Sequence, residues 1–114
     1  MTDDRRENPR VQILGELRGE IMVFHPMAVT EVATGGAQIE TAFPMQLDSL
    51  HDIRLTLGNR SVVVKARIAH CRISDVEEER VVYRSGVEFV ELSEHARIAI
   101  SAFVDALQES RKGL

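Results

Sequence analysis

The 114-residue sequence contains no tryptophan, one cysteine and three prolines. A single cysteine excludes an internal disulfide. No apolar run approaches the ~20 residues that a membrane-spanning helix needs, so we predict no membrane insertion. The first residues, 1–6, lack the apolar stretch of a secretory signal peptide. Together these absences predict a cytoplasmic location.

A positive net charge is also missing. The net charge is −4 and the sequence pI is about 5.5, whereas domains that bind duplex nucleic acid are usually basic. We therefore predict no DNA or RNA partner. The hydrophobic fraction of 44% is enough for one core, because disordered chains contain too few apolar residues to offset chain entropy. The length corresponds to one domain.

The first third of the chain has a β-strand pattern that begins at Val11, after a polar stretch over residues 1–10. We predict a flexible arm over residues 1–10 and a single folded domain over residues 11–114. A second strand is predicted over 22–32, bent at Pro26, and a short strand over 37–41. The pair Gly35-Gly36 predicts a turn between them, because glycine tolerates positive φ.

The middle of the chain predicts a hairpin. Apolar residues alternate over 53–57 and again over 62–70, and Gly58-Asn59 between them suits a type II′ turn. This alternation places His70 on the apolar face, which favours a core histidine. We predict a polar loop over 74–80 and a last strand over 81–91, with a bulge or a close backbone approach at Gly86.

After residue 92 the apolar period changes to that of a helix. Ser93 is suited to cap this helix at its N-terminus. The predicted buried face consists of Ile100, Phe103, Val104 and Leu107. The predicted fold class is therefore all-β with a C-terminal α-helix, namely six antiparallel strands in a barrel with the helix across it.

Catalytic and metal-binding patterns are weak. The four histidines are scattered, and His70 and Cys71 are adjacent on a strand, so they point in opposite directions and cannot form a dyad. Metal-ligand spacings and a phosphate-binding loop are missing. We predict that the protein is not an enzyme and that it needs no metal and no cofactor.

Two segments remain, and with this architecture they resemble the PilZ family. The family has an R-x-x-x-R motif before its first strand, and Arg6 and Arg10 reproduce it. A [D/N]-x-S-x-x-G motif follows in the family; residues 31–36 align with it, but Glu31 replaces Asp/Asn, Ala33 replaces Ser, and Gly36 alone matches. The segment 86–89, Gly-Val-Glu-Phe, is similar to the family's final strand.

The resemblance implies a receptor for cyclic di-GMP that relays the signal to a protein partner in motility, attachment or polysaccharide export. Arginine matches guanine and phosphate geometry, and the Glu31 carboxylate can accept hydrogen bonds from guanine. The two replacements predict weak binding. The implied ligand-binding residues are Arg5, Arg6, Arg10, Glu31, Ala33, Gly35 and Gly36.

Two alternatives remain open. The first is a PilZ-like adaptor that does not bind cyclic di-GMP and acts through protein contacts. For either function we predict a monomer or a weak dimer. The second is a small barrel that holds an apolar ligand or a short RNA. The RNA version lacks stacking side chains, since aromatic residues make up 4% of the chain.

Overall fold

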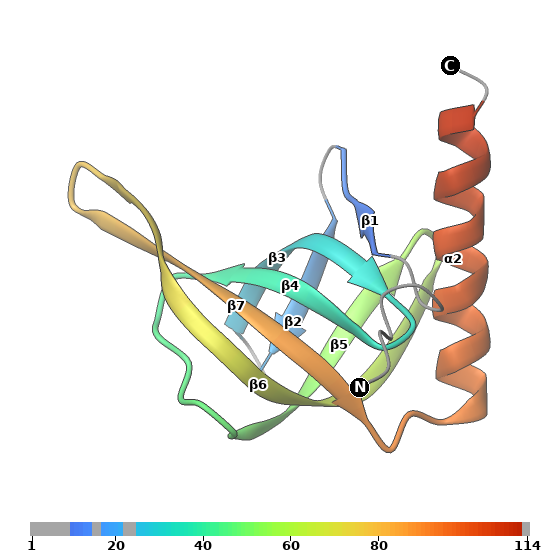
Figure 1. Cartoon of the computed structure of the whole chain (residues 1–114), viewed down its shortest axis with the longest axis horizontal. Coiled ribbons are helices and arrows are strands. Elements are labelled where there is room, and N and C mark those ends of the chain that lie inside the picture. Colours follow the sequence, from blue (N-terminus) through green and yellow to red (C-terminus); the bar gives the residue numbers. More distant parts are fainter. Residues whose placement is uncertain (1–9, 15–16, 22–24, 113–114) are drawn as a thin grey trace, which may run out of the picture.

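The computed structural model describes residues 10–14, 17–21 and 25–112. Within these described ranges, seven strands precede the helix α2 (Figure 1). In chain order these elements are β1 (Val11–Gln12), β2 (Arg18–Ile21), β3 (His25–Ala33), β4 (Gly36–Thr41), β5 (Leu50–Leu57), β6 (Arg60–Glu77), β7 (Arg80–Val90) and α2 (Glu94–Lys112).

The strands are all antiparallel and occupy six positions around a barrel. The pairings run β3–β2–β5–β6–β7–β4, and β4 also pairs with β3. The two-residue β1 pairs with the end of β3, on the edge that β2 also uses. The first predicted strand is therefore divided into β1 and β2. The prediction of a six-stranded barrel with a C-terminal helix is confirmed.

The barrel interior is apolar because alternate residues of each strand point inward. The most deeply buried side chains come from five strands: Val32, Ile39, Ile53, Leu55, Ile68 and Val87. The predicted hairpin is confirmed, because Leu57 pairs with Arg60 across a two-residue turn. Gly58 in this turn has a φ of 66°, which a type II′ turn requires.

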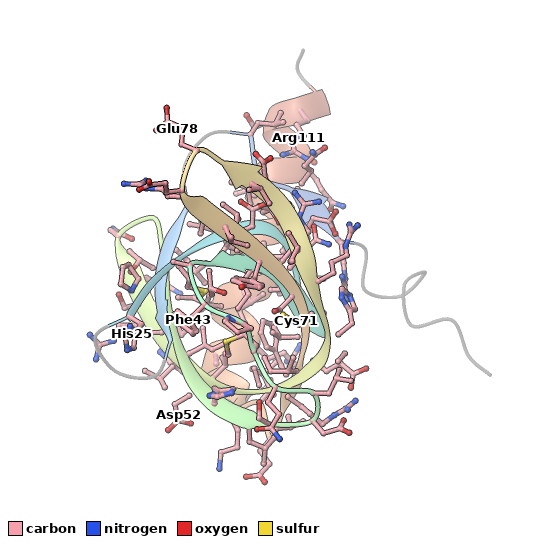
Figure 2. All side chains as sticks on the ribbon, turned by 90° about the vertical axis from the view of Figure 1, so that its left-hand side faces the viewer. His25, Phe43, Asp52, Cys71, Glu78 and Arg111 are labelled. Carbon is pink, nitrogen blue, oxygen red and sulfur yellow. The ribbon has the colours of Figure 1, made fainter. Side chains whose placement is uncertain are left out.

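At the rim of the barrel, the rings of His25 and Phe43 meet edge to face, and their centroids are 5.2 Å apart (Figure 2).

Two local predictions are wrong. The pair Gly35-Gly36 does not form the turn, because the turn residues are Thr34 and Gly35 and Gly36 already begins β4. Neither glycine has positive φ; among the described glycines only Gly58 does. The region 74–80 is not a loop, because β6 and β7 continue pairing as far as Glu77 and Arg80. The result is a long hairpin that projects beyond the barrel on the side away from α2 (Figure 1).

The helix α2 lies across the barrel and contacts β1, β3, β5 and β6. Ile100 and Val104 are buried as predicted. Phe103 and Leu107 are only partly buried, at the margin of the core. Two small residues that sequence reasoning did not select, Ala96 and Ala99, are buried as well, because short side chains bring the helix close to the strands.

The N-terminus of α2 is capped as predicted. The Ala96 N–H donates to Ser93 Oγ at 3.1 Å. We expect Ser93→Ala to lower the free energy of unfolding by about 1 kcal/mol, because one of the first backbone N–H groups then loses its partner. Urea unfolding measures this change. The exposed Ser110 in the last turn is the control, and an equal loss in Ser110→Ala would contradict a capping role for Ser93.

Candidate functional site

The structure brings together one residue of each predicted motif. Arg10 stands immediately before β1, which pairs with β3 so that Gln12 faces Glu31. The distance from Arg10 Nη1 to Glu31 Oε1 is 3.9 Å, and the two side chains are 37% and 35% exposed. The opposite charges are thus adjacent but remain accessible to a ligand. Arg5 and Arg6 lie outside the described residues, and so does nearly all of the predicted arm.

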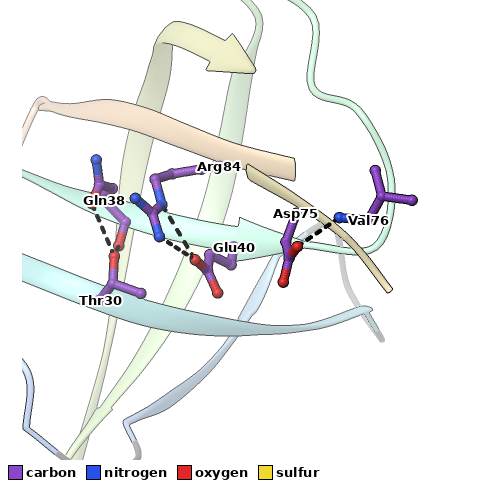
Figure 3. Close-up of polar contacts among 6 residues, drawn as sticks. All are labelled: Thr30, Gln38, Glu40, Asp75, Val76 and Arg84. Atoms are coloured by element: carbon purple, nitrogen blue, oxygen red, sulfur yellow. Dashed lines mark hydrogen bonds and ion pairs between the residues drawn. The ribbon is translucent and has the colours of Figure 1, made fainter. Parts of the chain in front are cut away.

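A β-bulge places Glu31 on the outer surface of the barrel. Val29 faces Ile39 and Glu31 faces Gln38 on β4, so Thr30 is an extra residue between them. The Thr30 hydroxyl lies 3.2 Å from both the backbone O and the Oε1 of Gln38 and donates to this pair of acceptors (Figure 3). The bulge changes the alternation so that Val29 and Val32 are both buried while Glu31 points outward. Sequence reasoning missed both the bulge and Gln38.

Small residues follow Glu31 along β3, the turn and the start of β4, but of Ala33, Gly35 and Gly36 only Gly35 is exposed. Ala33 is two residues farther along β3 on the same outer side, yet it is only 2% exposed and does not belong to the core cluster. A ligand can therefore reach Ala33 only after the atoms that cover it move. Gly35 is exposed in the turn, whereas Gly36 is buried. A Cβ on Gly36 would lie 2.3 Å from Val87 O, so the close approach of β7 already requires glycine there.

A charged cluster borders the glycine. Gly36 faces Glu88 on β7, and Glu88 faces Arg67 on β6. The Arg67 guanidinium donates to Glu88 and, through Nη1 at 2.7 Å, to Asp48. These two carboxylates raise the pKa of Arg67 above its already high ordinary value. The cluster is a polar border of the surface, and no sequence pattern indicated it because Asp48 lies in a loop.

His70 joins this surface, which corrects the prediction of a core histidine. A second bulge, between Ile68 and His70, reverses the alternation of β6 and turns His70 outward, where it is exposed. Its imidazole lies directly over Gly86, where an added Cβ would be 2.2 Å from Nε2. Gly86 in turn faces Gln38 on β4. The predicted close approach at Gly86 is confirmed, and the approaching group is the His70 ring.

The arrangement is suited to binding. It offers an accessible guanidinium, a carboxylate acceptor, small residues and a flat imidazole on one barrel surface. Among the described residues, no group of three or more His, Cys, Asp and Glu side chains could hold a metal ion. The Cys71 sulfur is already engaged, since it accepts the Met45 N–H at 3.4 Å. In the part of the chain that the structure describes, no helix combines the length and the apolar character needed to cross a membrane.

Several solved structures share this fold. The PilZ domain of Escherichia coli YcgR with c-di-GMP has a TM-score of 0.75 at 13% identity, over 96% of each chain. The K. pneumonia MrkH–c-di-GMP complex has a TM-score of 0.73 at 14% identity, over 96% of this chain and 56% of MrkH. The Bacillus subtilis inhibitor of motility MotI/DgrA has a TM-score of 0.73 at 16% identity, over 93% of this chain and 52% of that chain.

At such identities these similarities establish the fold. The chain spans about half the length of the MrkH and MotI/DgrA chains. No curated protein sequence matches it significantly. The sequence profile of the PilZ domain matches residues 4–106, which cover most of the chain and include both predicted motifs. The chain therefore belongs to the PilZ domain family.

Proposed function

We propose that the chain is a regulatory receptor domain, without catalytic activity, that binds cyclic di-GMP weakly in the cytoplasm and relays the signal to a protein partner. The observation that carries this proposal is the contact of Arg10 with Glu31 at 3.9 Å, because it joins the two ends of the predicted ligand site on one accessible surface. Further support comes from YcgR and MrkH, two proteins with this fold whose structures contain c-di-GMP.

The two charged residues match complementary parts of the ligand. The Arg10 guanidinium is planar and can donate in pairs to guanine O6 and N7 or to two phosphate oxygens. The Glu31 carboxylate can accept from guanine N1–H and N2–H₂. In the free chain these groups face each other, so the ligand has to separate them. That separation costs little, because exposed ion pairs contribute about 0–1 kcal/mol.

Weak binding follows from the second motif. Ala33 offers no hydroxyl, and a neutral hydrogen bond contributes about 0.5–1.5 kcal/mol. Glu31 is one methylene longer than Asp, which shifts its carboxylate from the position that the family motif implies. The low exposure of Ala33 adds a rearrangement to the binding step. The domain thus retains the cationic part of the site and has a reduced polar part.

Calorimetric titration with cyclic di-GMP tests the proposal. We expect weak binding to the native chain and none to Arg10→Ala. The double variant Glu31→Asp/Ala33→Ser should bind on the order of 30-fold more tightly, because two hydrogen bonds of about 1 kcal/mol each are recovered. The matched control is Arg60→Ala, which removes an exposed arginine at the β5–β6 turn that is not among the proposed site residues, and it should leave the affinity unchanged.

Thermal unfolding of each variant shows whether it is folded. A folded double variant that gives no heat at high ligand concentration would reject the receptor function in favour of the non-binding adaptor. An Arg60→Ala variant as defective as Arg10→Ala would indicate binding through net charge, without a specific site.

A further inference from the structure

The hairpin of β6 and β7 extends past its neighbours in the barrel. Along the chain, β6 pairs with β5 only as far as Arg67. Strand β7 begins at Arg80 but pairs with β4 only from Tyr83 onward. From Asp75 and Val82 to the turn, the two strands pair only with each other among the described strands. Both edges of this ribbon are therefore open (Figure 1), and open strand edges are templates for pairing with another chain.

The ribbon also exposes apolar side chains. Ile73 is 58% exposed and Val76 is 61% exposed. In the register of the hairpin they face Tyr83 and Val81, respectively. The four side chains thus form cross-strand pairs, at a place where the barrel no longer covers them. A partner that covers them would gain apolar burial in addition to backbone hydrogen bonds.

A cavity of about 600 Å³ lies beside this ribbon. It lies where β4 has ended, at Thr41. The two neighbours of β4, the strands β3 and β7, both extend past that end and leave a space between them. The cavity is lined by Pro26, Glu40, Thr41, Ala42, Glu79, Arg80, Val81 and Val82. It therefore continues the position of β4, with the start of β7 along one side and Pro26 on the other.

The backbone of β7 offers hydrogen bonds to this cavity. Phe89 N–H donates to Gly35 O on the β4 side, at 3.0 Å. Peptide groups alternate in direction along a strand, so every second residue from Phe89 down to Val81 directs its N–H and C=O to that side. Tyr83 faces Thr41, the last residue of β4. The N–H and C=O of Val81 consequently face the cavity. Pro26 has no N–H, so β7 supplies the hydrogen bonds.

The charge of the ribbon indicates the occupant. Asp75, Glu78 and Glu79 are exposed at its end, where Arg80 is the neighbouring base. Glu77 adds a fourth acidic residue to this sequence segment. Glu40, on the wall of the cavity, is already paired with Arg84 at 2.8 Å (Figure 3). The exposed acidic side chains at this end of the ribbon outnumber the one base beside them, and this excess of negative charge attracts a cationic chain.

We propose that this cavity binds an extended segment of a protein partner, with alternating basic and apolar residues, as a strand added to β7. The apolar residues would lie on the face of the ribbon that carries Val81 and Tyr83, because alternate residues of a strand share one face. The basic residues would reach Glu78 and Glu79 at the end of the ribbon. This mode is strand addition, in which backbone hydrogen bonds provide affinity and alternate side chains provide specificity. At about 3.3 Å per residue, Val82 lies about 13 Å along β7 from Gly86, the nearest β7 residue of the proposed nucleotide surface, so the two surfaces are separate.

Nuclear magnetic resonance on the ¹⁵N-labelled chain tests the proposal with a short, capped peptide that alternates lysine and valine. We expect saturable shifts centred on residues 80–82 and slower hydrogen exchange at the Val81 amide. The same peptide with N-methylated backbone amides, and a peptide that alternates glutamate and valine, should both bind more weakly. Glu79→Lys should weaken the lysine–valine peptide about two- to fivefold, while the same charge change on α2, Asp105→Lys, should have no effect.

Three results would overturn this proposal: no saturable shift, shifts centred elsewhere, or equal binding of the N-methylated peptide. A fourth contradictory result would be a dimer, seen by sedimentation without peptide, whose amides at residues 80–82 exchange slowly. That result would identify a second copy of the chain as the occupant. Arg10→Ala should bind the peptide as the native chain does. Its titration with cyclic di-GMP therefore separates a failure of the nucleotide site from a failure of this docking surface.

Discussion

Ile100→Ala should lower the free energy of unfolding by about 2–5 kcal/mol, measured by urea denaturation. Ile100 is fully buried where α2 meets the barrel. Truncation removes the favourable transfer of its apolar atoms and leaves a cavity between the helix and the strands. The rigid β-strands around it have little freedom to close that cavity, which favours the upper half of the range.

Ile98→Ala provides the matched control, because it is the same substitution on the same helix. Ile98 is 51% exposed, and alanine has the higher helix propensity, so we expect a change below about 1 kcal/mol. Equal losses for the two variants would mean that α2 is not docked through Ile100. Phe103→Ala should fall between them, because Phe103 is only partly buried.

Gly36→Ala should destabilise the protein by about 1–3 kcal/mol. The added Cβ would lie 2.3 Å from Val87 O and 3.4 Å from Glu88 Cα. Both are backbone atoms of a paired strand, so relief of the clash requires β4 and β7 to move apart at the edge of the proposed ligand site. We therefore also expect weaker binding of cyclic di-GMP. Thermal unfolding and calorimetry measure the two effects.

Gly86→Ala is the control for this variant. Its Cβ would clash with His70 Nε2 at 2.2 Å, but His70 is exposed and its side chain can rotate away. We expect a loss well below that of Gly36→Ala. If Gly86→Ala were the more destabilising variant, the His70 ring would be held rigidly, and the backbone contact at Gly36 would not be the principal constraint on this surface.

The sequence predicts elements best where period and turn chemistry agree. The hairpin at Gly58-Asn59 and the helix that begins after Ser93 are confirmed because each has both a regular apolar period and a specific end signal. The prediction of a loop over 74–80 is wrong because charge alone suggested it. Charged residues are common on exposed strands, and cross-strand pairing with residues 80–83 holds this segment in β6.

The candidate site was partly predictable. The spacing of Arg6 and Arg10 and the family motif at residues 31–36 identified segments that the structure can be compared with, and Arg10 and Glu31 do lie together. Gln38, Arg67 and His70 were missed. Gln38 lies opposite Glu31, beside the bulge at Thr30, and Arg67 and His70 are brought to this surface because β7 pairs with both β6 and β4. Neither the bulge nor the pairing of β7 with β4 leaves a local pattern in the sequence.

The sequence by itself determined the fold class, the alternation that fills the barrel, the position of the helix and the family resemblance, because these depend on local periods and short motifs. Only the tertiary structure decided which side chains share a surface. Two one-residue bulges, at Thr30 and between Ile68 and His70, direct Glu31 and His70 outward. A single extra residue reverses every later side chain of a strand. Only the pairing of complete strands determines where that extra residue lies.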